Sequence, residues 1–350
     1  MSTSKAGPPR VSVVVPNYNH ARFLHQRLDS ILVQSLQDFE VLILDDCSTD
    51  ESRDVIAEYQ ADPRVTAHFN TTNSGSTFRQ WAKGLKWARG AFVWFAESDD
   101  RAHPTFLERT VELLERHPNV GMATTQSWVI DEKGQRLGSY IDEQAKLYGD
   151  VDHWRRDYLN SGPDERATYF YRANPVPNAS AVLFRRDVLA NRVRIPVKMR
   201  LNGDWMLYAR VLKVSDIAFL AEPLNDYRHH PNTVRHQSDR VDVAWGEAIM
   251  VHRELLRDSN AHQRGAFADE VRAYVFTSID KARRPPRGKV PPADLPALVR
   301  RTSVAGWSGL KLALPILAKE TAADLLRGPF GRRNAGAETL DTRKAPPDTA

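Results

Sequence analysis

The chain has 350 residues, of which 41% are hydrophobic and 27% are charged, a composition that is ordinary for a globular protein and argues against a disordered or fibrous one. Its net charge of +5, from 49 basic and 44 acidic residues, is too small to indicate nucleic-acid binding and fits anionic small ligands or an anionic surface. The single cysteine, Cys47, excludes an intrachain disulfide and a thiolate zinc site, which favours a reducing, cytoplasmic setting.

Strands and helices are expected to alternate through the first third of the chain. β-branched and aromatic runs predict strands, and apolar residues at three-to-four spacing predict helices. The strands are expected at 11–15, 39–44, 64–69, 91–96 and 120–127, and the helices between them at 21–34, 51–60, 77–89 and 104–117. Because such connections are right-handed crossovers between parallel strands, the pattern predicts an α/β domain on a mostly parallel sheet.

The remainder of the chain is less regular. A variable connection at 131–178 precedes expected strands at 179–184 and 217–220, a helix opened by Asn202-Gly203-Asp204-Trp205, and helices at 241–257, 265–283 and 293–300. We therefore expect a disordered N-terminus (1–10), a catalytic domain (11–235), a helical C-terminal extension (236–330) and a disordered tail (331–350). No apolar run reaches the length of a membrane-spanning helix, and the N-terminus lacks the apolar core of a signal peptide.

Acidic side chains directly follow two of the expected strands. The apolar strand 91–96 runs into Glu97, Asp99 and Asp100, and strand 39–44 runs into Asp46. Ligands of parallel α/β sheets bind beyond the carboxyl ends of the strands, so both acidic turns are expected at one site. Adjacent carboxylates repel unless a cation relieves them, and Mg²⁺ and Mn²⁺ take carboxylate and phosphate oxygens. The alternative, in which an acid caps the next helix, accounts for only one of these side chains.

The turn after the first strand excludes two common nucleotide-binding classes. It contains neither the G-x-x-x-x-G-K-[ST] loop of ATPases nor the G-x-G-x-x-G turn of dinucleotide dehydrogenases. It carries Asn17, Tyr18 and Asn19 instead, whose ring and amides are suited to stack on and hydrogen-bond a base.

Four segments in order resemble a known enzyme family. They read V-S-V-V-V-P-N-Y-N at 11–19, F-E-V-L-I-L-D-D-C-S at 39–48, N-S-G at 73–75 and E-S-D-D at 97–100. Together they resemble glycosyltransferase family 2, whose members are inverting nucleotide-diphosphosugar transferases of the GT-A fold. The resemblance covers about residues 10–230. It implies a GT-A domain followed by a helical C-terminal extension, and a nucleotide-diphosphate sugar donor, with UDP-sugars favoured.

The resemblance also implies roles for particular residues. The expected nucleotide-sugar-binding residues are Pro16, Tyr18, Asn19, Asp46, Arg79 and Asp99. Asp100 is expected to bind Mn²⁺ or Mg²⁺, because it matches the last acid of the family's D-x-D triplet, which here reads Ser98-Asp99-Asp100. His230 lies in Y-R-H-H-P-N-T, similar to a late family signature, and is expected to be a second metal or diphosphate ligand. Asp204, in Gly203-Asp204-Trp205, matches the catalytic base.

Structural alternatives to these roles remain open. Asp204 would then be a helix cap, Asp46 a turn residue, Tyr18 a core aromatic, Arg79 a solvated helix charge and His230 a structural histidine.

The expected activity is metal-dependent, inverting transfer to a hydroxyl of a glycan or lipid-linked acceptor, in cell-surface polysaccharide biosynthesis. A nucleotidyltransferase and a non-catalytic binding protein on a transferase fold are the alternatives. The segment 304–326 has apolar residues at helical spacing with lysine and arginine nearby. It either packs against the catalytic domain or a homodimer partner, or lies on an anionic membrane surface. The second interpretation places the protein at the inner face of the cell membrane.

Overall fold

The computed structural model describes residues 7–149, 151–230 and 241–257. The chain divides into two units, Met1–Phe267 and Ala268–Ala350, and every described residue belongs to the first. Outside the described residues lie 1–6 of the expected disordered N-terminus, the helices expected at 265–283 and 293–300, the amphipathic segment 304–326 and the expected tail 331–350.

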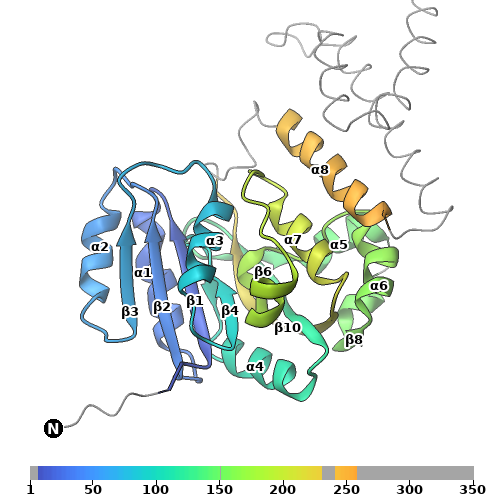
Figure 1. Ribbon diagram of the computed structural model, residues 1–350, viewed down its shortest axis with the longest axis horizontal. Coiled ribbons are helices and arrows are strands. Elements are labelled where there is room, and N and C mark those ends of the chain that lie inside the picture. The colour runs from blue at the N-terminus through green and yellow to red at the C-terminus, as the bar shows by residue number, and fades with distance from the viewer. Residues whose placement is uncertain (1–6, 150, 231–240, 258–350) are drawn as a thin grey trace, which may run out of the picture. The chain divides into compact units, whose positions relative to one another are not determined.

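A ten-stranded mixed sheet runs through the described unit (Figure 1). Its main path has the order β3-β2-β1-β4-β9-β6-β10-β5, while β7 pairs with β6 and β8 pairs with β10. The strands are β1 (Val11–Asn17), β2 (Phe39–Asp45), β3 (Val65–Phe69), β4 (Phe92–Phe95), β5 (Arg101–Ala102), β6 (Val120–Ile130), β7 (Arg136–Ser139), β8 (Tyr158–Asn160), β9 (Val182–Arg185) and β10 (Asp216–Arg228). The β-branched run of β1 and the apolar run of β2 are buried along their whole length, as central strands require.

Helices cover both faces of this sheet. Because side chains alternate along a strand, Val13 and Val15 of β1 join a core with α1, α2 and α4, whereas Val14 joins a second core with α3, α7 and α8. The helices are α1 (Ala21–Leu32), α2 (Ser52–Tyr59), α3 (Thr77–Trp87), α4 (Phe106–Arg116), α5 (Ile141–Tyr148), α6 (Gly162–Glu165), α7 (Gly203–Val211) and α8 (Val241–Leu256). Short helical turns lie at Asp152–Arg155, Arg166–Phe170, Ala179–Ala181 and Val188–Arg192.

The expected parallel order is found from β3 to β4, is interrupted at β9 and resumes between β6 and β10. β1 pairs in parallel with β2 and β4, and β2 pairs in parallel with β3. β9 then lies between β4 and β6 and is antiparallel to both. The chain reaches β9 only after the long connection from residue 131, so the crossover rule that predicts the first four strands does not determine its direction. That connection is also more regular than expected, because it contains β7, α5, β8 and α6.

Candidate active site

The loops after β1 and β2 are joined at the carboxyl edge of the sheet. The backbone N–H of Asp46 donates to the carbonyl of Asn17 at 2.8 Å, and the side chain of Asn19 accepts from the N–H of Thr49 at 2.7 Å. Asn19 and Cys47 have φ values of 56° and 67°, in the left-handed region that asparagine tolerates better than most residues. Asn19, an expected nucleotide ligand, therefore takes part in holding the two loops together.

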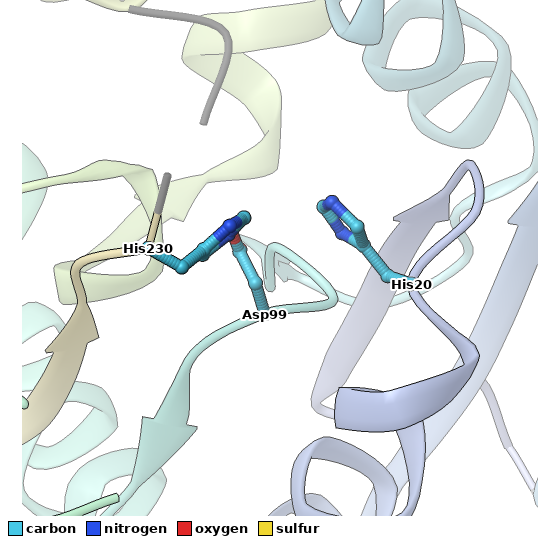
Figure 2. A group of neighbouring side chains, drawn as sticks. All are labelled: His20, Asp99 and His230. Atoms are coloured by element: carbon cyan, nitrogen blue, oxygen red, sulfur yellow. The ribbon is translucent and has the colours of Figure 1, made fainter. Parts of the chain in front are cut away.

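Two histidines and one carboxylate converge where β1, β4 and β10 end (Figure 2). His20 precedes α1, Asp99 follows β4 and His230 follows β10, and one ligand atom from each lies within 4.8 Å of the others. His230 Nε2 and Asp99 Oδ2 are 3.1 Å apart, and His20 Nδ1 is hydrogen-bonded to the hydroxyl of Ser98 at 2.8 Å. The sequence prediction included Asp99 and His230 but missed His20. The available signal was its position directly after the strand-end turn at 17–19.

Asp100 does not join this cluster. Its side chain is buried and accepts hydrogen bonds from the side chain of Asn178, from the hydroxyl of Ser180 at 2.7 Å and from the N–H of Arg228 at 3.0 Å. Burial raises the pKa of Asp100 to about 7, and the charge of Asp99 adds to the effect. Burial also acts to raise the pKa of Asp99, but its hydrogen bond to His230 and the nearby His20 lower that pKa to about 2. The structure thus brings Asp99, and not Asp100, beside His230.

Two buried arginines hold the backbone of the acidic turn. Arg27 Nε donates to the carbonyl of Glu97 at 2.8 Å, and Arg228 Nε donates to the carbonyl of Asp99 at 2.6 Å. The Glu97 carboxylate accepts from the indole N–H of Trp81 at 2.8 Å, and burial, followed by the charge of Asp99, raises its pKa to about 8. The arginine cations offset part of the repulsion among these acids.

The Asp46 side chain holds the loop that leads into α3. Its two carboxylate oxygens accept from the side chain of Asn70 at 2.6 Å, from the N–H of Ser74 at 2.9 and 3.0 Å, from the Ser74 hydroxyl at 2.7 Å and from the side chain of Gln80 at 2.9 Å. These contacts are internal to the protein. Asp46 was expected to accept a hydrogen bond from the base, and the geometry shows that it organises the loop around 70–76.

Replacing Asp46 by asparagine is therefore expected to destabilise the protein by about 1–3 kcal/mol, because the new amide N–H₂ would face donors that are left without an acceptor. Urea unfolding measures this change. The control is Asp54→Asn on the exposed surface of α2, which should change the free energy of unfolding by about 0.5 kcal/mol or less. Equal stabilities for the Asp46 and Asp54 variants would show that the carboxylate does not hold the loop.

The remaining expected nucleotide ligands lie around the same edge. Pro16 is within the buried strand β1, and Tyr18 directly follows that strand with 46% of its surface exposed, so it is not a core aromatic. Arg79 lies in the first turn of α3 and donates from Nη1 to the carbonyl of Ser74 at 2.9 Å. Its exposed side chain therefore belongs to the loop that Asp46 organises.

Asp204 lies in the first turn of α7 and accepts a hydrogen bond from the side chain of Asn174 at 3.2 Å. The N-cap position of this helix is occupied by Asn202, so Asp204 is not the cap. The preceding Gly203 has a packing reason to be glycine, because a Cβ atom there would lie 2.5 Å from the ring of Phe78. This close approach sets the start of α7 against α3.

Comparison with known proteins agrees with this architecture. Residues 12–191 match the profile of glycosyl transferase family 2. An uncharacterized glycosyltransferase of Nostoc sp., alr2836, is 31% identical over 225 residues, which are 63% of this chain and 65% of that protein. TuaG of Bacillus subtilis, named for teichuronic acid biosynthesis, is 36% identical over 141 residues, which are 40% of this chain and 55% of TuaG. The chain thus spans less than two thirds of the length of these relatives.

Solved structures share the fold at low sequence identity. TarS 1-349 of S. aureus in complex with UDP-GlcNAc superposes with a TM-score of 0.64 at 18% identity, over 90% of this chain and 88% of that chain. The mannosyltransferase PcManGT of Pyrobaculum calidifontis, in complex with GDP-Man and Mn²⁺, gives a TM-score of 0.54 at 18% identity, over 91% of this chain and 88% of that chain. The profile match extends over more than half of the chain, and the superpositions show the expected fold. The chain therefore belongs to glycosyl transferase family 2 and has the GT-A fold.

Proposed function

We propose that the protein is a metal-dependent, inverting glycosyltransferase. It would move a sugar from a nucleotide-diphosphate donor to a hydroxyl of a glycan or lipid-linked acceptor, in cell-surface polysaccharide biosynthesis. The observation that carries the proposal is the convergence of His20, Asp99 and His230 at the ligand-binding edge of a family 2 fold. The name of TuaG, which assigns it to teichuronic acid biosynthesis, is the basis for the proposed class of pathway.

The cluster of His20, Asp99 and His230 fits a divalent metal. Metal ligands must be unprotonated, and the burial that lowers the pKa of His20 favours its neutral form. We therefore propose Asp99 as the carboxylate ligand in place of Asp100, with His230 as expected and His20 as an additional ligand. Two imidazoles suit Mn²⁺ better than Mg²⁺, which prefers oxygen ligands, and PcManGT carries Mn²⁺. A bound metal would neutralise charge on the donor diphosphate.

Separate residues of the protein would then remove the proton and hold the donor. The Asp204 carboxylate accepts the proton of the acceptor hydroxyl while that oxygen attacks C1 of the donor sugar. The bond between C1 and the phosphate oxygen breaks, and the nucleoside diphosphate leaves with the electron pair. Because attack comes from the face opposite the leaving group, the configuration at C1 inverts. Arg79 would contact the diphosphate, and the exposed ring of Tyr18 would stack on the base.

The two alternatives have less support. A nucleotidyltransferase would carry a glycine-rich, basic loop after the first strand, where this chain has Pro16-Asn17-Tyr18-Asn19. A binding protein without catalysis does not need a carboxylate in the first turn of α7, where Asp204 lies.

Within the described residues, no helix has the length and apolar character needed to cross a membrane. Peripheral membrane contact, which a lipid-linked acceptor would favour, was expected from segment 304–326, outside those residues.

The donor is tested by thermal denaturation with a panel of UDP-sugars, GDP-mannose and nucleoside triphosphates, each with Mn²⁺ or with a chelator. A ligand present at 100 times its Kd stabilises the native state by about 2.7 kcal/mol, so the donor is expected to raise Tm by several degrees. We expect a UDP-sugar to give this shift only with Mn²⁺. A shift with a nucleoside triphosphate and with no nucleotide sugar would favour a nucleotidyltransferase instead.

A further inference from the structure

Helix α8 lies beyond the segment that matches the family profile, and it packs against α7 (Figure 1). The sequence pattern predicts this helix as part of a separate C-terminal extension. In the structure, Val251 and Leu255 of α8 belong to the same core as Trp205 and Tyr208 of α7. Helix α8 is therefore an integral part of the unit that contains the candidate site.

One side chain of α8 binds the turn that precedes the expected catalytic base. The buried carboxylate of Glu247 accepts three backbone hydrogen bonds. Its Oε1 accepts from the N–H of Arg200 at 2.6 Å, and its Oε2 accepts from the N–H groups of Leu201 and Asn202 at 2.9 and 2.8 Å. Hydrogen bonds to an ionised acceptor are stronger than neutral ones, and three of them converge here on one carboxylate.

The same turn has two further attachments. The side chain of Asn202 donates to the carbonyl of Ala244, also in α8, at 2.6 Å. The hydroxyl of Ser76, at the start of α3, donates to the carbonyl of Met199 at 3.0 Å. The turn 199–202 therefore connects α8 to the loop that Asp46 organises, and Asp204 follows it after a single residue.

These contacts determine where α7 begins. The N-cap residue Asn202 and the two residues before it have no partner within the helix for their N–H groups, and the Glu247 carboxylate accepts from all three. Without that acceptor, the three N–H groups of the turn need other hydrogen-bond partners, so the turn shifts. The first turn of α7 shifts with the turn. A general base must lie within hydrogen-bond reach of the proton that it removes, and a displacement of about 1 Å can cost catalysis about 100-fold.

We propose that Glu247 is a positioning residue, which holds the turn 200–202 and through it places Asp204 for proton removal. This inference rests on the proposed function, because it assumes that Asp204 is the base. It makes helix α8 a required part of the catalytic unit, with Glu247 acting through the turn 200–202 and Asp204.

The experiment compares the full-length parent with Glu247→Ala, Glu247→Gln and the control Glu254→Ala. Glu254 lies two turns further along α8, and its partly buried side chain pairs with Arg257 at 3.0 Å. The control thus removes a glutamate from the same helix without touching the turn 200–202. Three quantities are measured: amide hydrogen exchange of peptides that span residues 199–203, release of nucleoside diphosphate from UDP-glucose, UDP-N-acetylglucosamine and GDP-mannose with Mn²⁺, and the Kd of the same donors by calorimetric titration.

We expect Glu247→Ala to speed amide exchange at 199–203 and to lower kcat by about 10- to 100-fold, with the donor Kd unchanged. Glu247→Gln should fall between Glu247→Ala and the parent, because an amide oxygen at the Oε2 position keeps two of the three bonds, and it remains informative where the alanine variant fails to fold. Glu254→Ala should match the parent in all three measurements.

Unchanged exchange in Glu247→Ala, or faster exchange with an unchanged kcat, would overturn the positioning role alone. A folded parent that releases nucleoside diphosphate from none of the donors would contradict the proposed function as well. The two failures are therefore distinguishable, because the first requires an active parent.

Discussion

Replacing Asp204 by asparagine is expected to slow sugar transfer by a factor of about 10² to 10⁴ and to leave donor binding unchanged. Asparagine has nearly the same shape as aspartate, and it can keep the contact with the side chain of Asn174. It cannot accept the acceptor's proton, so the loss should appear in kcat and not in the donor Kd. Steady-state kinetics and calorimetric titration of the donor measure the two quantities separately.

The matched control for this variant is Asp142→Asn. Asp142 also lies in the first turn of a helix, α5, and it is exposed. If the helical position alone mattered, both variants would lose a similar amount of stability and neither would lose kcat. Parental turnover in the Asp204 variant would remove it as the base. A large loss of kcat in the Asp142 variant would instead indicate that the base lies in the 131–178 connection.

The second large effect distinguishes the two adjacent aspartates of the acidic turn. Asp99→Asn is expected to weaken Mn²⁺ binding by more than about 100-fold, since even residues one layer outside the metal ligands typically contribute 10–100-fold. Asp100→Asn is expected to keep Mn²⁺ binding and to lose about 1–3 kcal/mol of stability, because its side chain accepts from Asn178, Ser180 and Arg228. Electron paramagnetic resonance titration of Mn²⁺ and urea unfolding separate the two outcomes.

The reverse result would restore the ligand that the family resemblance implied. If Asp100→Asn lost Mn²⁺ and Asp99→Asn kept it, the contacts of Asp100 with Asn178 and Ser180 would have to break when the metal binds. Chelator-treated protein provides the reference for both variants, because it shows the signal expected for complete loss of the site.

The first four strands could be predicted from sequence because β-branched runs and helical spacing are local signals. The acids at their ends followed from the same pattern, since carboxyl ends of parallel strands share an edge. The position of β9 could not be predicted in this way. Its place between β4 and β6 depends on a connection whose length and turns carry no strand-order signal.

Which acid faces the site depended on residues far away in sequence. Asp99 and Asp100 are neighbours with similar local signals, but Asn178 and Arg228, some 80 and 130 residues further on, are the ones that bind the Asp100 carboxylate. His20 was missed for a similar reason, because its partner His230 lies 210 residues away. Glu247 carries no local sign of its contacts with the turn 200–202. Each of these contacts is set by tertiary packing, which local pattern does not encode.

The central claim is tested most directly by following a nucleotide sugar by ¹H NMR in the presence of the protein and Mn²⁺, with water or an added glycan as acceptor. An α-linked donor such as UDP-glucose should lose its anomeric signal while the β-anomer of the product appears first, and a chelator should stop the reaction. First appearance of the α-anomer, or equal rates with and without the chelator, would contradict metal-dependent inverting transfer.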